Sequence, residues 1–228
     1  MVDTTRLRLV DVGGSGGLEP EWHPYAQQID AVLFEPNPEA AEDLRRQGYK
    51  TVEAALSSVD GTRTLYVTHN PLCISLHRPN PDIVARYDLH EHYQIINEVP
   101  IGCRRYDSLF REGAVEIPDV VKVDTQGHEF DVLLGFGGLL SDCLGIVLET
   151  HIYPLYHGEK LLGDIVGLLE PFGIVLRRLE RTSACDGDFV EANAYFTVSR
   201  QRARSLDTAR LEKLALLSEI WKLDRYHL

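Results

Sequence analysis

A turn made almost entirely of glycine, Gly13–Gly17, directly follows an apolar run at residues 7–12. Glycine adopts positive φ and lets backbone N–H groups approach an anionic group closely. A second apolar run ends in Glu35, 18 residues after Gly17. In nucleotide-binding α/β proteins, an acid about 20 residues beyond a glycine turn accepts hydrogen bonds from ribose hydroxyls. The spacing therefore predicts a nucleoside site, whereas the glycines alone would also fit an ordinary surface turn.

Two further apolar runs end in carboxylates, at Asp124 and at Glu149. Because ligands of open α/β sheets bind beyond the carboxyl ends of the strands, we expect these acids to converge with Glu35. The chain lacks G-x-x-x-x-G-K-[ST], and its glycines do not fit the dinucleotide spacing G-x-G-x-x-G. A ligand with a ribose but no phosphate fits better. S-adenosylmethionine offers a carboxylate to the glycine turn, hydroxyls to Glu35, and a cationic sulfonium and ammonium to neighbouring acids.

Strands that alternate with helices predict an α/β fold with a mostly parallel sheet and helices on both faces. The expected strands are residues 7–12, 31–35, 50–56, 63–68, 99–105, 119–124, 145–149, 174–179 and 194–198. The last two strands are expected to pair antiparallel at one edge. The expected helices are residues 39–47, 106–111, 129–134, 160–169 and 206–221. Pro20 and Pro24 limit residues 18–28 to a short or broken helix.

Length and composition place the chain among single-domain globular proteins, with 228 residues and 44% hydrophobic content. We expect a domain at residues 1–200 and an amphipathic helix within 201–228, which docks on its own domain or, alternatively, forms a homo-oligomer contact. The net charge of −12 argues against general nucleic-acid binding. No apolar run approaches the roughly 20 residues of a membrane helix. Four dispersed cysteines without a CxxC motif indicate free thiols and a cytoplasmic location.

Three segments together resemble the FkbM family of S-adenosylmethionine-dependent methyltransferases: Val10–Gly17, Phe34–Pro38 and Val121–Gly135. The third segment carries the most specific signature, K-x-D-x-x-G-x-E-x-x-x-L-x-G. The resemblance runs from about residue 7 to 198. It implies the Rossmann-like class I methyltransferase fold, with seven strands in the order 3-2-1-4-5-7-6. It also implies O-methylation of a hydroxyl on a sugar, glycan or secondary metabolite.

The resemblance assigns cofactor roles to residues of these segments. Asp11 and the glycine turn would bound the methionine end, Glu35 would accept the ribose hydroxyls, and Asp124 would face the ammonium or the methyl group. The full expected cofactor set is Asp11, Gly13, Gly14, Ser15, Gly17, Glu35, Pro36, Ala55, Leu56 and Asp124. Asp124 would also suit an N-cap of the following helix. Glu129 suits either catalysis or a first-turn acid favoured by the helix dipole.

A hydroxyl is a poor nucleophile, so methyl transfer to it calls for a base that removes its proton. His151 is the first candidate, because imidazole titrates near neutral pH and residue 151 lies just past a strand end. The other candidates are Asp124, Glu149 and His128. A magnesium-type site of Asp124, Glu149 and His151 is a less favoured alternative, and we see no H-x-x-x-H pair.

The long segment at residues 69–98 interrupts the strand pattern with prolines, histidines and tyrosines. Long connections of this kind carry function or pack as plain excursions on a sheet edge. We expect it to form a wall of the acceptor site, with contacts from Asn70, Ser75, His92 and Tyr93. Two other functions stay open, an NAD-dependent oxidoreductase and a non-catalytic binding protein with a Rossmann-like fold.

Overall fold

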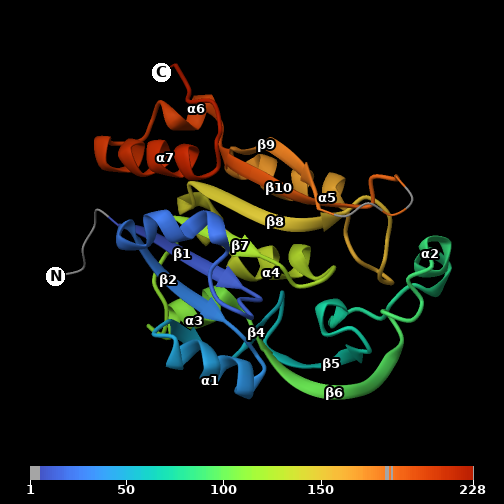
Figure 1. Ribbon diagram of the computed structural model, residues 1–228. Coiled ribbons are helices and arrows are strands. Elements are labelled where there is room, and N and C mark those ends of the chain that lie inside the picture. The colour runs from blue at the N-terminus through green and yellow to red at the C-terminus, as the bar shows by residue number, and fades with distance from the viewer. Residues whose placement is uncertain (1–5, 183–184, 186, 228) are drawn as a thin grey trace.

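The computed structural model describes residues 6–182, 185 and 187–227. Its centre is a seven-stranded sheet in the order β3-β2-β1-β7-β8-β10-β9 (Figure 1). Counted along the chain within this sheet, the order is 3-2-1-4-5-7-6, which confirms the predicted fold class. The strands are β1 (Leu7–Val12), β2 (Ile29–Phe34), β3 (Lys50–Val52), β7 (Val120–Val123), β8 (Gly145–His151), β9 (Ile174–Arg181) and β10 (Glu191–Val198).

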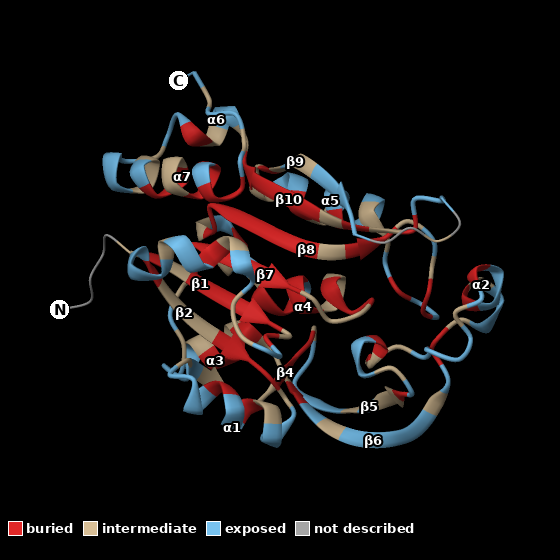
Figure 2. Ribbon diagram, viewed as in Figure 1, coloured by how far each residue is buried: buried red, intermediate tan, exposed pale blue. Residues whose placement is uncertain are grey.

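The central strands are apolar on both faces because helices cover both sides of the sheet (Figure 2). β1 pairs in parallel with β2 and with β7, and β7 pairs in parallel with β8. β10 runs antiparallel to both β8 and β9, as predicted for the last two strands. The carboxyl ends of β1, β2, β7 and β8 therefore lie at one edge.

One face of the sheet is covered by the 3-10 helix η1 (Pro20–Gln28) and by α7 (Thr208–Ile220). Trp22 and Trp221 meet edge to face on this side, with ring centroids 6.0 Å apart. η1 contains Pro24, in line with the broken helix that the prolines predict. The opposite face packs against α3 (Tyr106–Arg111), α4 (Glu129–Phe136), η4 (Gly137–Asp142) and α5 (Leu162–Leu169), whereas α1 (Pro38–Arg46) contacts β3.

The expected single strand at residues 50–56 is wrong, because the chain leaves the main sheet after Val52. β4 (Ala55–Leu56) instead pairs with β6 (Ile95–Arg104), which also pairs antiparallel with β5 (Gly61–Thr68). These strands form a second sheet that curves away from the first (Figure 1). The connection from β5 to β6 holds η2 (Pro71–Cys73), α2 (Pro81–Val84) and η3 (Ala85–Tyr87).

This connection is docked onto the loop that follows β8. The N–H of Asn80 donates to the carbonyl of Leu155 at 2.8 Å, and the N–H of His157 donates to that of Arg78 at 2.8 Å. Tyr93 packs against Tyr156, with ring centroids 5.6 Å apart. The segment thus stands against the carboxyl end of β8.

The C-terminal part contains α6 (Arg200–Ala203) and α7, which follow η5 (Glu170–Phe172) and the last two strands in the chain. Leu214, Leu217 and Trp221 of this region are buried against the chain's own sheet. Among the described residues, no helix combines the length and apolar character of a membrane span. The four cysteines all lie in the described part of the chain and are unpaired there.

Candidate active site

The glycine turn joins the ends of three strands. The N–H of Gly13 donates to the carbonyl of Phe34 at 3.0 Å, and the N–H of Asp124 donates to the carbonyl of Val12 at 2.9 Å. Gly13 has a φ of +81°, and a Cβ atom there would lie 2.0 Å from the carbonyl oxygen of Asp124. Only glycine fits this junction, which brings the ends of β1, β2 and β7 together as predicted.

Glu35 follows β2 directly and is buried. Its Oε1 atom accepts the N–H of Asn37 at 2.8 Å, and Asn37 in turn caps α1. Burial raises the pKa of Glu35 above its ordinary value. Of the other expected cofactor residues near this end, Ala55 and Leu56 are buried on β4, and Pro36 is half-buried. Ser15 and Gly16 are exposed at the tip of the turn.

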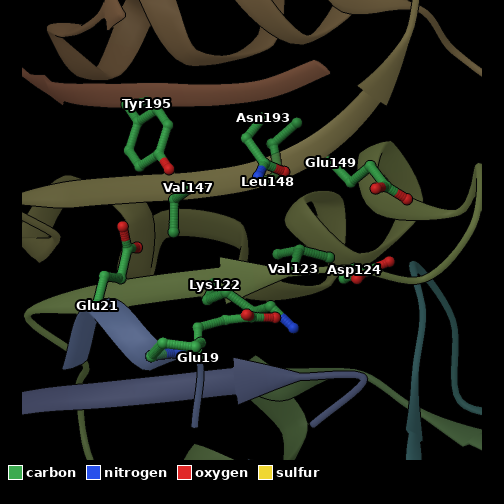
Figure 3. Close-up of a pocket in the computed structure, with 11 residues that line it drawn as sticks. Glu19, Glu21, Lys122, Val123, Asp124, Val147, Leu148, Glu149, Asn193 and Tyr195 are labelled. Atoms are coloured by element: carbon green, nitrogen blue, oxygen red, sulfur yellow. The ribbon is translucent and has the colours of Figure 1, made fainter. Parts of the chain in front are cut away.

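A cavity of about 220 Å³ opens beside the ends of β7 and β8 (Figure 3). Asp124 and Glu149, both predicted, lie on its wall, and Lys122 projects into it. Glu35, which was expected to converge with these acids, does not line this cavity. Four further lining residues were missed by the sequence analysis: Glu19, Glu21, Asn193 and Tyr195. Glu19 and Glu21 flank Pro20 just after the glycine turn. Two acidic residues at that place were the signal from which the sequence could have predicted them as site residues. The cavity is therefore rich in carboxylates and suited to a cationic ligand.

Asp11 does not line this cavity. It is fully buried on β1, and its Oδ1 atom lies 3.1 Å from Nζ of Lys122. The structure thus gives Asp11 a contact that the sequence analysis did not foresee. This contact holds Lys122, the lysine of the family signature, in position.

The signature segment from Asp124 to Glu129 forms a tight loop held by the buried Glu129 carboxylate. Its Oε1 atom accepts the N–H groups of Thr125 at 2.8 Å and Gly127 at 3.2 Å. Burial raises the pKa of Glu129 to about 7. The N-cap residue of α4 is His128, so the expected N-cap role of Asp124 is wrong. Asp124 instead accepts a hydrogen bond from the amide of Gln126 at 3.0 Å.

Glu149 carries the most perturbed carboxyl group of the cavity wall. Burial raises its pKa to about 9, and the neighbouring carboxylates of Asp124 and Glu191 add to the rise. The amide of Gln126 donates to it at 2.5 Å. With a pKa in this range, the carboxyl group holds its proton at neutral pH. Such a perturbed group in a cleft is typical of a functional site.

His151, the first candidate base, is buried between two carboxylates. Its Nδ1 atom lies 2.7 Å from Glu159, and its Nε2 atom lies 3.6 Å from Glu191. Burial alone would lower the pKa of His151, but the contacts with Glu159 and Glu191 outweigh it and raise the pKa well above the ordinary value. An imidazole held as a cation cannot accept a proton. These contacts therefore argue against His151 as the base.

His128 does not line the cavity. Its two ring nitrogens contact Ser57 Oγ and His77 Nε2, both at 3.0 Å. Burial lowers the pKa of His128 to about 3, so the ring is neutral. The structure does not bring His128 together with Asp124 and Glu149 in one cavity.

The expected acceptor residues fall into two groups. Ser75 is buried, donates to the carbonyl of Gln126 at 2.6 Å and accepts the N–H of His77 at 2.9 Å. Tyr93 is buried against Tyr156. Both hydrogen bonds of the Ser75 hydroxyl are made within the fold, which argues against direct contact between Ser75 and an acceptor. Asn70 caps η2 and is half-buried, whereas His92 is exposed.

The sheet order and the glycine turn at the strand ends are those of a Rossmann-like α/β protein. The family model described as "Methyltransferase FkbM domain" matches residues 21–178. The chain therefore belongs to the FkbM family of S-adenosylmethionine-dependent methyltransferases, which confirms the resemblance found in the sequence.

One curated relative is the 2-O-methyltransferase NoeI of Sinorhizobium fredii. It is 26% identical over 185 residues, which cover 73% of this chain and 72% of the relative. Among solved structures, the chain is similar to a TehB-like methyltransferase from Corynebacterium glutamicum, with 12% identity, a TM-score of 0.41, and coverage of 85% of this chain and 80% of that one. It is also similar to the magnesium protoporphyrin IX methyltransferase of Synechocystis, with 11% identity, a TM-score of 0.45, and coverage of 86% and 76%.

Proposed function

We propose that this protein transfers a methyl group from S-adenosylmethionine to a hydroxyl of a sugar, a glycan or a hydroxylated secondary metabolite. The observation that carries the proposal is the carboxylate-rich cavity at the ends of β7 and β8, next to the glycine turn. A sulfonium donor is cationic at its reacting centre, so carboxylates complement it. The 2-O-methyltransferase relative supports oxygen as the acceptor atom.

The donor is placed along the strand ends. In this proposal, Glu35 accepts the ribose hydroxyls, Ala55 and Leu56 lie against the adenine, and the N–H groups of Gly13–Gly17 meet the donor's carboxylate. Asp124 faces its ammonium group. Charge-assisted hydrogen bonds of this kind give a site both affinity and orientation.

We assign the base to Glu149 rather than His151. A cation bound beside Glu149 would lower its pKa from about 9 and leave the carboxylate ready to accept a proton. S-adenosylmethionine would supply the methyl group when bound, and Glu149 would take the proton of the acceptor hydroxyl as that oxygen accepts the methyl group. The burial that raises the pKa of Glu149 would favour its uptake of that proton.

The β5–β6 connection and the loop after β8 supply the acceptor wall in this proposal. Tyr156 bridges the two, because its hydroxyl donates to the carbonyl of Cys73 at 3.0 Å and lies 3.2 Å from Oε1 of Gln126. Gln126 also contacts Asp124 and Glu149. The acceptor wall is thereby coupled to the reacting centre through one side chain.

Calorimetry with S-adenosylhomocysteine and with NAD tests the donor. The proposal predicts binding of the first compound and none of the second. Mass spectrometry of sugars and hydroxylated metabolites incubated with S-adenosylmethionine then tests transfer, with an expected mass gain of one methylene per acceptor. Binding of NAD alone would establish the oxidoreductase alternative, and binding of S-adenosylhomocysteine without transfer to any hydroxyl acceptor would favour a binding protein.

A further inference from the structure

A second cluster of chemically reactive side chains lies outside the cavity. It consists of His77 from the β5–β6 connection, and of His128 and Asp131 at the start of α4. His77 Nε2 and His128 Nδ1 are 3.0 Å apart, and each lies 3.9 Å from Asp131 Oδ2. All three potential ligand atoms lie within 4.8 Å of one another.

The remaining polar atoms of these side chains have partners of their own. His77 Nδ1 lies 3.1 Å from the carbonyl oxygen of His157. Because a carbonyl oxygen can only accept a hydrogen bond, Nδ1 carries the proton and the lone pair of Nε2 is free to bind a metal ion. His128 Nε2 lies 3.0 Å from Ser57 Oγ. Asp131 Oδ1 accepts the hydroxyl of Ser58. Outer contacts of this kind orient the rings and carboxylates of metal sites.

The types of the three ligands indicate which metal ion the cluster would bind. Two imidazoles and one carboxylate suit Zn²⁺ better than Mg²⁺ or Ca²⁺, which prefer oxygen ligands. Ligand atoms of a tetrahedral zinc site lie roughly 3.3 Å apart, given zinc–ligand distances near 2.0–2.1 Å. The observed separations of 3.0 and 3.9 Å bracket this value and need only a small movement of Asp131.

The cluster is accessible to an ion from solvent. His77 and Asp131 have side-chain exposures of 16% and 24%, while His128 is buried at the base of the cluster. Three protein ligands leave one zinc position for water. The guanidinium of Arg63 approaches the outer oxygen of Asp131, at 3.8 Å from Oδ1, and therefore leaves Oδ2 directed at the two rings.

We propose that His77, His128 and Asp131 form a zinc-binding site that fastens the β5–β6 connection to α4. Two hydrogen bonds connect His77 to the Gln126 loop. The backbone N–H of His77 donates to the hydroxyl of Ser75, and that hydroxyl donates to the carbonyl of Gln126. A bound ion therefore holds the wall at residues 69–98 in place beside the Gln126 loop. This inference does not depend on methyl transfer.

The test measures zinc binding directly. Protein stripped with a chelator is titrated with Zn²⁺ in competition with a chromophoric zinc indicator. We expect one ion per chain with a dissociation constant below about 1 µM, because the fold already holds the three ligands close together. Loss of a residue that only orients a metal ligand weakens metal binding by roughly 10–100-fold. Because His77→Ala and Asp131→Ala each remove a ligand itself, each should weaken zinc binding by at least about 100-fold.

The matched controls are His69→Ala and His90→Ala, which remove exposed histidines of the same segment. Both should bind zinc like the wild-type protein, and circular dichroism establishes that every variant is folded. Zinc should also raise the melting temperature of the wild-type protein but not that of His77→Ala. The proposal is overturned if the wild-type protein binds zinc no tighter than about 1 µM. It is equally overturned if His77→Ala and Asp131→Ala both bind like the wild-type protein, or if the control variants lose binding.

Discussion

The Nζ atom of Lys122 lies 3.1 Å from Oδ1 of Asp11, at opposed positions of the adjacent strands β7 and β1. Burial raises the pKa of Asp11, and the contact with Lys122 lowers it without offsetting that rise. Burial alone would lower the pKa of Lys122. The charges of Asp11 and Asp124 outweigh that burial and raise the pKa of Lys122. The contact with Asp11 therefore favours the charged form of Lys122 within the sheet, and Lys122 also lines the cavity.

Removal of one partner of this buried pair should cost more stability than removal of a surface pair. We expect Lys122→Met to lower the free energy of unfolding by about 3–5 kcal/mol, because it leaves Asp11 buried without its counter-charge. Lys50→Met is the matched control, since Lys50 pairs with Asp30 on the surface of the same sheet. It should cost less than about 1 kcal/mol. Urea denaturation measures both, and equal losses would contradict the central role of the buried pair.

The raised pKa of Glu149 predicts that stability falls as pH rises. The carboxyl has an ordinary pKa of 4.5 and a folded-state pKa of about 9. Between these values the folded chain holds a proton that the unfolded chain has lost. The free energy of unfolding should therefore decrease by up to about 1.4 kcal/mol per pH unit from this group. Glu149→Gln should flatten that slope, measured by urea denaturation at pH 6, 7 and 8.

The exposed Glu98→Gln is the control for this experiment, because Glu98 pairs with Arg78 on the surface. It should keep the pH dependence of the wild-type protein. A slope that is the same in all three proteins would show that Glu149 is ionised in the folded state at neutral pH.

Glu35→Gln tests the placement of the donor ribose. The variant keeps the carbonyl that accepts the N–H of Asn37 but loses the charge. Hydrogen bonds to a charged acceptor are about twice as strong as neutral ones, so we expect S-adenosylhomocysteine to bind about 10–100-fold more weakly. Glu39→Gln, an exposed change in the first turn of α1, should leave the affinity unchanged. Calorimetry checks both variants, and wild-type affinity in Glu35→Gln would remove Glu35 from the site.

The main sheet could be predicted from the sequence because its strands are local apolar runs that end in recognisable residues. The strand at residues 50–56 could not, because its second half pairs with Cys103 and Arg104, almost fifty residues further along the chain. No local pattern reports such a partner. The order of the strands came from the family resemblance and not from periodicity.

The candidate site, like the fold, was predicted from the sequence only in part. Glu35 and Asp124 were found because each directly follows a strand, and strand ends share an edge. Glu149 was found in the same way, although β8 continues past it to His151. The environment of His151 was missed, since its partners Glu159 and Glu191 come from two separate segments. A histidine in the sequence suggests a base, but the carboxylates around His151 determine whether its ring can accept a proton.

Gly13→Ala tests the junction of the strand ends. Its φ of +81° disfavours any side chain, and the new Cβ would lie 2.0 Å from the carbonyl oxygen of Asp124. Gly16→Ala is the matched control, because Gly16 has a φ of +89° but no heavy atom within 4 Å of the added Cβ. The control should lose about 1–2 kcal/mol through backbone strain alone.

Gly13→Ala should lose clearly more than this control, because the end of β7 must move to relieve the clash. That movement displaces Asp124, so the affinity for S-adenosylhomocysteine should fall in Gly13→Ala well beyond any change in Gly16→Ala. Urea denaturation and calorimetry on the two variants measure the two effects separately. If both variants lose the same stability and bind alike, the close approach of Gly13 to Asp124 does not position the donor site.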